Sequence, residues 1–135
     1  MSTELASITK TEQGWPGHFV LGHRCIFHRN TLLTKVSRVN SVTQIIVSTV
    51  GNMQPPEGKE DDGLYRQIGH NRYYETMVFY ATFEDPYWHV DVQRQIDLWG
   101  PCSISTCERE DDLKANAMHE AAVVEIEGRL LQGSV

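Results

Sequence analysis

Cysteine is scarce in this 135-residue chain, and its three copies, Cys25, Cys102 and Cys107, form an odd set. An odd number argues against a framework of disulfides and is typical of proteins in a reducing compartment. No apolar run approaches the roughly 18 residues that a membrane-spanning helix needs. The polar first segment, MSTELASITKTEQ, lacks the apolar core of a secretory signal. We therefore expect a cytoplasmic protein with no membrane partner.

Basic residues are also in short supply. The chain has 12 Lys and Arg residues against 18 Asp and Glu, a net charge of −6 and a pI near 5.4. Proteins that bind duplex nucleic acid normally carry a basic surplus, so no duplex partner is expected. The acidic residues gather in EGKEDD and CEREDD, which leaves single arginines in a nearly neutral middle. That distribution favours a pocket for a small anion.

Catalytic and metal-binding motifs are missing too. The sequence contains no G-x-S-x-G, H-E-x-x-H or G-x-G-x-x-G. His18, His23 and His28 are spaced five apart, so they would alternate between the faces of a strand and not converge on one metal. Cys25 precedes apolar Ile26 and Phe27, which predicts a buried, inert thiol. We predict no metal, no cofactor and no catalytic residue.

Strand signals dominate the first hundred residues. Residues 18–36 alternate loosely and predict two strands or one bent strand, with Gly22 as a bulge. A turn at SRVN precedes residues 41–50, SVTQIIVSTV, whose β-branched side chains predict a strand. Residues 51–71 predict a long loop. A hairpin follows, which begins at Arg72, is broken at EDP and returns through YWHVDVQRQIDLW.

The end of the chain predicts a helix, which we place at residues 105–132. Ser105 precedes Glu108 by three residues, as in a capping box. Two apolar stripes recur at helical spacing: Leu113, Ala117, Ala121 and Val124, and then Met118, Ala122, Ile126 and Leu130. We predict a single α+β domain, residues 1–135, in which an antiparallel sheet carries the C-terminal helical region on one face and residues 1–13 form a flexible tail. The width of the apolar helix face predicts a homo-oligomer through this helix.

The predicted hairpin is unusually rich in aromatic side chains. If Phe79 and its alternate neighbours face the core, then Tyr74, Thr76, Val78 and Tyr80 form a second, amphipathic face. We expect this second face to meet a subunit or a flat ligand. The alternative is that tyrosine and threonine are present there for their strand propensity alone.

Polar candidates for a ligand site occur elsewhere in the predicted sheet. Arg29 and Asn30 are consecutive donors suited to phosphate and base edges, unless they belong to an ordinary polar turn. Thr49 ends a strand just before Gly51, which is either a point of close backbone approach or a plain turn residue. The full set of expected ligand-binding residues is Arg24, His28, Arg29, Asn30, Thr49, Arg72, Tyr73, Tyr74, Phe79, Tyr80, Trp88 and Arg94.

Four blocks of the sequence resemble a family of small phage and prophage proteins: GWPGHFVLGHRCIFHRNTLL, IIVSTVG, RYYETMVF and ANAMHEAAVVEIEGRLLQG. The layout of a β-rich first two-thirds, an aromatic hairpin and one strong final helix also resembles the first type of Thoeris anti-defence phage sponge. That resemblance implies an oligomeric protein that binds cyclic ADP-ribose isomers, and in some members cyclic trinucleotides, without cleaving them. It supplies no residue motif, so the site residues above come from the residue patterns alone.

Three functions remain open from the sequence. The first is a non-enzymatic sponge for a cyclic nucleotide immune signal. The second is an inhibitor that binds a host protein complex through the acidic residues Glu60, Asp61 and Asp62. The third is a small nucleotide-processing enzyme with a carboxylate pair, such as Glu75 and Asp91 facing each other across the hairpin.

Overall fold

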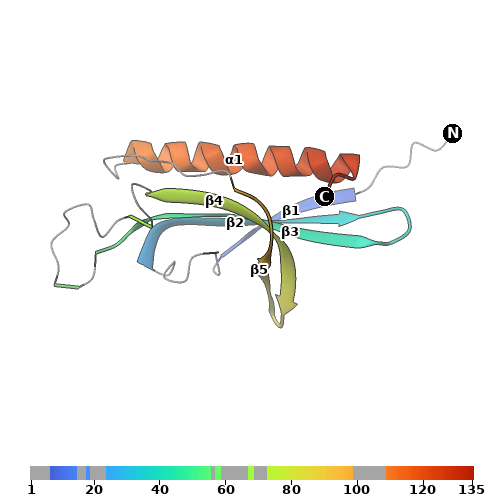
Figure 1. The fold of residues 1–135 in the computed structure, drawn as a ribbon, viewed down its shortest axis with the longest axis horizontal. Coiled ribbons are helices and arrows are strands. Elements are labelled where there is room, and N and C mark those ends of the chain that lie inside the picture. The colour runs from blue at the N-terminus through green and yellow to red at the C-terminus, as the bar shows by residue number, and fades with distance from the viewer. Residues whose placement is uncertain are drawn as a thin grey trace.

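The fold is a five-stranded antiparallel sheet with one long helix across a face (Figure 1). The computed structural model describes residues 7–14, 18, 24–55, 57–58, 67–68, 73–98 and 109–135, with helix side chains from residue 112 onward. The elements are β1 (Ser7–Gln13), β2 (Cys25–Val36), β3 (Val42–Met53), β4 (Tyr74–Glu84), β5 (Tyr87–Leu98) and α1 (Arg109–Gln132). Strand order in the sheet follows the chain, β1-β2-β3-β4-β5. The predicted α+β class is confirmed.

Residues 7–13 depart from the expectation of a flexible tail. They form the edge strand β1, which pairs with β2 from Ser7 opposite Val36 to Gln13 opposite Asn30. Side-chain alternation along β1 puts Ile8 and Lys10 on the face towards α1. Ile8 packs against the core beneath α1 and the side chain of Lys10 reaches Glu127 at 3.0 Å, which holds this polar stretch on the sheet. The predicted bulge at Gly22 and the predicted capping box at residues 105–108 lie outside the described residues.

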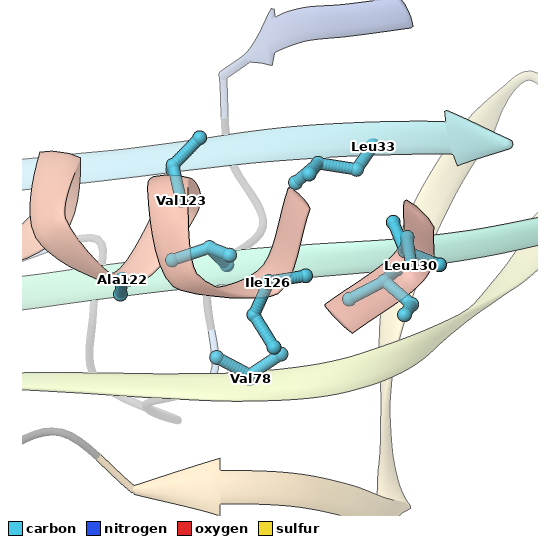
Figure 2. Close-up of a cluster of buried hydrophobic side chains, with 8 residues drawn as sticks. Leu33, Val78, Ala122, Val123, Ile126 and Leu130 are labelled. Carbon is cyan, nitrogen blue, oxygen red and sulfur yellow. The ribbon is translucent and has the colours of Figure 1, made fainter. Parts of the chain in front are cut away.

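The main core lies between the sheet and α1, as Figure 2 shows. Ile126 points at Val78 of β4, with Leu130 and Val123 beside it. The buried members of this cluster are Leu33, Ile45, Val47, Val78, Ala122, Val123, Ile126 and Leu130. Ala122, Ile126 and Leu130 belong to one predicted helical stripe, so that stripe is the face that α1 buries.

The other predicted stripe lies on the far side of α1. Its members Leu113 and Val124 are 61% and 66% exposed, and Leu131, which was not part of the predicted stripe, is 55% exposed. The small residues Ala121 and Gly128 lie between them in sequence and line a shallow groove with Val124. The helix then ends in a Schellman arrangement, because Gly133 has a φ of 74° and the Ser134 amide donates to the Arg129 carbonyl at 2.8 Å.

The two faces of β4 are the reverse of the expectation. Tyr74 and Val78 are fully buried and face α1, whereas we predicted this face to meet a subunit or a flat ligand. The helix of the same chain covers it. Sequence alternation sorts side chains into two sets but does not say which set meets a helix, and here both sets are apolar.

Gly51 lies inside β3 and is not a plain turn residue. It is paired with Tyr74 of β4, and a β-carbon at this position would lie 2.7 Å from the Tyr74 Cα. The alternative of close backbone approach is therefore the correct one, and the approaching group is the neighbouring strand.

β3 and β4 separate at one end of the sheet and create a fork. Their pairing runs from Gly51 opposite Tyr74 to Ile45 opposite Tyr80 and stops there. Residues 42–44 of β3 keep partners on β2 alone, and residues 81–84 of β4 keep partners on β5 alone. Figure 1 shows the result: the β2–β3 hairpin continues along the helix direction while the β4–β5 hairpin bends away from it.

Candidate ligand-binding site between two hairpins

A cavity of about 330 Å³ occupies the fork. Residues 42–44 of β3 form one wall, Tyr80 and Ala81 of β4 form the base of the second, and Trp88 and Arg94 of β5 complete it. We call it the fork cavity. Its volume is at the lower end of the range for small-molecule sites, enough for one flat ring and its substituents.

A bulge in β5 brings Arg94 to this cavity. Phe79 pairs with Gln95 and Ala81 pairs with Val90, so two steps along β4 span five steps along β5. The extra residues bend the hairpin away from β3. Asp91 organises the bulge, because its carboxylate accepts from the Gln93 amide at 3.1 Å and from Arg94 Nε at 2.8 Å.

Aromatic side chains line the cavity on two strands. The Arg94 guanidinium carbon lies 5.0 Å from the centre of the Tyr80 ring, a cation–π contact. Trp88 packs on a second small core of Leu32, Ile46 and Ala81 on the sheet face opposite α1. Its ring also meets Phe83 at 5.2 Å with an angle of 62° between planes. These contacts fix the orientation of the Tyr80 and Trp88 rings while leaving them partly exposed.

The fork cavity carries one cationic side chain, and this side chain is ion-paired with Asp91. Arg94 is the charged member of the lining, and no carboxylate lines the cavity among the described residues. Asp91 contacts Arg94 through Nε, so the terminal nitrogens Nη1 and Nη2 have no protein acceptor in the described part of the chain. An arginine fork beside two aromatic rings is suited to a flat anion.

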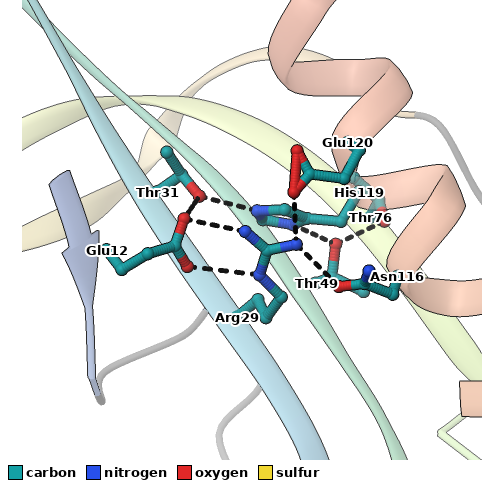
Figure 3. Close-up of polar contacts among 8 residues, drawn as sticks. All are labelled: Glu12, Arg29, Thr31, Thr49, Thr76, Asn116, His119 and Glu120. Atoms are coloured by element: carbon teal, nitrogen blue, oxygen red, sulfur yellow. Dashed lines mark hydrogen bonds and ion pairs between the residues drawn. The ribbon is translucent and has the colours of Figure 1, made fainter. Parts of the chain in front are cut away.

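The structure places Arg29 in a different setting, between the sheet and α1 (Figure 3). Its Nη2 and Nε donate to the two carboxylate oxygens of Glu12 at 2.8 and 3.2 Å. Its Nη1 donates to Asn116 Oδ1 at 2.6 Å and to Glu120 Oε2 at 2.8 Å. The guanidinium therefore donates its hydrogen bonds to protein acceptors and is not available to a ligand.

Thr49 belongs to the same buried network. His119 of α1 is fully buried, with Nδ1 2.7 Å from Thr49 Oγ1 and Nε2 2.7 Å from Thr31 Oγ1. Thr49 Oγ1 also lies 2.6 Å from Thr76 Oγ1. The network links three strands to the helix (Figure 3).

The carboxylate of Glu12 fixes which group donates and which accepts in the series of hydrogen bonds from Glu12 through His119 to Thr76. A carboxylate only accepts, so Thr31 donates to Glu12 at 2.6 Å and must accept from His119 Nε2–H. Burial, with Arg29 nearby, lowers the pKa of His119 to about 4, so the ring is neutral near pH 7. Neutral His119 then accepts at Nδ1 from the Thr49 hydroxyl, and Thr49 accepts from Thr76.

Three further predicted ligand residues are buried within the protein. Asn30 is fully buried and donates from Nδ2 to the Gly14 carbonyl at 3.0 Å. Tyr74 is fully buried and its hydroxyl donates to Asp112 of α1. Phe79 is 2% exposed. None of the three presents a surface to a ligand.

Three others lie at the opposite end of the sheet from the fork cavity. Arg24 donates to the Gln54 carbonyl at 2.8 Å, and His28 is opposite Val50. Tyr73 directly precedes β4 at this same end. Val50 and Gln44 lie about 20 Å apart along β3. Arg72 lies outside the described residues, as do residues 60–62 of the predicted acidic loop. The fork cavity therefore gathers Tyr80, Trp88 and Arg94 of the predicted set.

The β3 wall of the fork cavity was not among the expected ligand-binding residues; it consists of Val42, Thr43 and Gln44. These residues begin a strand in an unremarkable polar and β-branched pattern. Their exposure to a cavity depends on where β4 leaves β3, and no local pattern marks that point. The extra residues of β5 that form the bulge lie in the polar run DVQRQ, and nothing else in the sequence marks them.

A second unpredicted cluster lies on the sheet face opposite α1. His18 Nδ1 is 3.0 Å from Ser48 Oγ, and His18 Nε2 is 3.1 Å from Glu75 Oε1. The order of groups is that of a serine–histidine–carboxylate triad. Ser48 is fully buried, however, and its hydroxyl also accepts from the His18 amide at 3.2 Å. The contacts anchor His18 to the sheet.

The predicted carboxylate pair of an enzyme is not formed. Glu75 contacts His18, whereas Asp91 holds Arg94. Cys25 is buried, as predicted, and burial raises the pKa of its thiol to about 11, which keeps it protonated and unreactive near neutral pH.

The chain matches no protein-family model, no curated protein and no solved structure. Within the described ranges, no helix combines the length and the apolar character needed to cross a bilayer.

Proposed function

We propose that this protein binds and holds a cyclic nucleotide immune signal in the fork cavity without cleaving it, as a phage counter-defence sponge. The observation that carries the proposal is the convergence of Tyr80, Trp88 and Arg94 on one cavity. Aromatic faces stack on bases and contribute about 1–3 kcal/mol per base. An arginine fork binds phosphate oxygens in pairs.

Size and charge are consistent with one part of such a ligand. A cavity of about 330 Å³ accommodates a single base with its neighbouring phosphate, so the rest of a cyclic dinucleotide or cyclic ADP-ribose isomer would extend outside. The lining carries a cation although the whole chain has a net charge of −6. The ion pair with Asp91 uses Nε alone, so the terminal nitrogens of Arg94 remain as donors for an anionic group.

Thermal denaturation against a panel of cyclic ADP-ribose isomers, cyclic dinucleotides and cyclic trinucleotides tests the proposal. A ligand at a hundred times its dissociation constant adds about 2.7 kcal/mol to the folded state, a shift of several degrees. Arg94→Ala should abolish the shift, and chromatography should recover the compound intact. Conversion of the compound would instead establish an enzyme, and no shift across the panel would overturn the proposal.

Arg24→Ala is the matched control for that experiment. Arg24 is also an arginine of the sheet, but it lies at the opposite end and hydrogen-bonds to the Gln54 carbonyl. We expect Arg24→Ala to keep the full ligand-induced shift. Equal losses in the two variants would contradict the assignment of the fork cavity.

We also propose that the chain forms homo-oligomers through the outer face of α1. Leu113, Val124 and Leu131 expose more than half of their surface on this face, with Ala121 and Gly128 allowing close helix approach. The neighbouring acids are already neutralised: Glu120 pairs with Arg29, Glu125 with Arg129 and Glu127 with Lys10. A second copy would therefore meet an apolar stripe without strong repulsion.

Light scattering coupled to size-exclusion chromatography tests this self-association. Val124→Glu places a charge in the middle of the stripe and should yield monomers. Val39→Glu is the control, because Val39 is 78% exposed in the β2–β3 turn, away from α1. A monomeric wild type, or dissociation by Val39→Glu alone, would contradict the proposal.

A further inference from the structure

The bulge of β5 contains a carboxylate with two separate partners. Within the described strands, residues 91–94 have no place in the ladder between β4 and β5. Asp91 Oδ1 accepts from the Gln93 amide at 3.1 Å, which closes a local turn of the Asx type. Asp91 Oδ2 accepts from Arg94 Nε at 2.8 Å. One side chain therefore shapes the bulge and also holds the arginine of the fork cavity.

The Arg94 guanidinium is restrained from two directions. Asp91 holds its Nε, and its Cζ lies 5.0 Å from the centre of the Tyr80 ring. Because the guanidinium is planar, a contact at Nε alone leaves Nη1 and Nη2 together at the end of the group. Such a pair of nitrogens can bind two oxygens of one phosphate.

Arg29 shows that a carboxylate partner does not always leave these nitrogens free. Glu12 takes both Nε and Nη2 of Arg29, and Asn116 and Glu120 take Nη1. The difference between the two arginines is the edge that the carboxylate occupies. At Arg94 it occupies Nε alone, so the group is held without being used up.

The restraint matters because Arg94 is on the surface. Its side chain is 54% exposed, and among the described residues only Asp91 hydrogen-bonds to it. A long side chain that becomes ordered only on binding lowers affinity by about 2- to 10-fold. An arginine that is ordered beforehand avoids that loss.

We propose that Asp91 is a positioning residue of the fork cavity, which does not touch the nucleotide but holds Arg94 with its two terminal nitrogens left for the phosphate. This inference rests on the proposed function of nucleotide binding. Asp91 carries the same sign of charge as the phosphate, so its restraint of Arg94 must outweigh the repulsion between two exposed charges. The test therefore has to separate restraint from charge.

Asp91→Asn is the decisive variant. Asparagine keeps an acceptor oxygen for the Gln93 amide but has no second oxygen for Arg94 Nε. Titration calorimetry with cyclic di-GMP, cyclic di-AMP and cyclic ADP-ribose is carried out in about 0.5 M sodium chloride, where the screening length is about 4 Å. We expect the variant to bind about 3- to 10-fold more weakly every compound that the wild type binds. Equal or tighter binding overturns the proposal.

Arg94→Lys supplies the matched background for that comparison. Lysine keeps the positive charge but has no planar fork to orient. Asp91→Asn should therefore leave the affinity of Arg94→Lys unchanged, or raise it by removing a negative charge. Equal losses in the two backgrounds would show that Asp91 acts only through the shape of the bulge, which overturns the positioning role.

A measurement without ligand separates this inference from the proposed function. The heteronuclear NOE of the Arg94 Nε–H group reports side-chain order on the picosecond to nanosecond timescale. Its signal is the one that disappears in Arg94→Lys. We expect a value close to that of backbone amides in the wild type, and close to that of the exposed Arg38 in Asp91→Asn.

The combined outcomes distinguish the two proposals. A mobile Arg94 in the wild type overturns the restraint by Asp91 whatever binds. An ordered Arg94 with nucleotide binding that Asp91→Asn does not weaken overturns the positioning role and leaves the nucleotide site standing. An ordered Arg94 with no binding of the three compounds overturns the nucleotide site, and the role of Asp91 in binding with it.

Discussion

Two regions of the sheet carry the same kinds of side chain in opposite conditions. Beneath α1, Arg29 contacts three side-chain acceptors and Tyr74 is fully buried against Asp112. In the fork, Arg94 hydrogen-bonds only to Asp91 among the described residues and lies over a partly exposed Tyr80. Residue type does not determine whether a side chain is bonded within the protein or available to a ligand. What determines it is whether α1 covers that region of the sheet.

The difference follows from which elements reach each end of the sheet. The helix covers the part where β2, β3 and β4 remain paired, and it supplies Asn116, His119 and Glu120 as partners. Where β4 leaves β3, no ladder partner fills the gap within the described residues. A polar group whose hydrogen bonds are made within the protein contributes to stability. A polar group without such a partner can contribute to ligand binding.

The largest expected effect is on the covered side, from Ile126→Ala. Ile126 is fully buried between α1 and Val78, so its truncation leaves a cavity and should lower the free energy of unfolding by about 4 kcal/mol. Urea denaturation measures the loss. The control Val124→Ala, on the exposed face of the same helix, should change stability by less than about 0.5 kcal/mol. Similar losses in both would show that α1 packs with another face.

The next effect is a loss of stability in acid that originates at His119. Its pKa falls from 6.5 in the unfolded chain to about 4 in the folded one, so the unfolded state binds the proton more readily. The contribution of His119 to the free energy of unfolding is fully present above pH 6.5. It is lost as the pH falls through 4, and the total loss is about 3 kcal/mol.

Glu12 acts in the same direction, because contacts with Arg29 and Thr31 lower the pKa of its carboxyl against the opposing effect of burial. Urea denaturation at a series of pH values from 7 down to about 3 measures the combined slope, because the contribution of Glu12 is lost mainly below its usual pKa of 4.5. His119→Asn removes the ring titration and should flatten the slope while lowering stability near pH 7. An unchanged slope in that variant would place the acid sensitivity elsewhere.

Arg29→Ala should cost about 1–3 kcal/mol of stability, a smaller effect because the side chain is partly solvated. The loss comes from leaving Glu12 and Asn116 without their shared donor. Ligand affinity, corrected for the unfolded fraction, should be unchanged. A specific loss of affinity in a fully folded variant would bring the covered network into the binding site.

Arg94→Ala should have the smallest effect on stability, within about 0.5 kcal/mol, because its ion pair with Asp91 is exposed. Nucleotide binding should nevertheless be lost. Denaturation and titration of the same preparation give both quantities. Comparison with Arg29→Ala then tests the contrast directly, since one arginine should alter stability and the other affinity.

Much of the fold can be predicted from the sequence. β-branched residues indicate β3, and the EDP break separates β4 from β5. Two apolar repeats indicate the helix, but only the structure shows that the repeat with Ile126 is the buried one. The candidate site is less predictable. Tyr80, Trp88 and Arg94 were expected among twelve ligand residues, but nothing in the pattern separates them from Arg29, Thr49 and Tyr74.

The sequence by itself determined β3, the β4–β5 hairpin and the apolar stripes of the helix, because these depend on local propensity and on periods of two and 3.6 residues. It did not determine β1, whose polar residues are held by pairing with β2. The tertiary structure decided which face of β4 the helix covers, since Val78 and Phe79 make both faces apolar. It also decided that β4 leaves β3 after Tyr80, because that point depends on the bulge in β5 and on pairing between strands distant in sequence. The fork cavity exists only at that point.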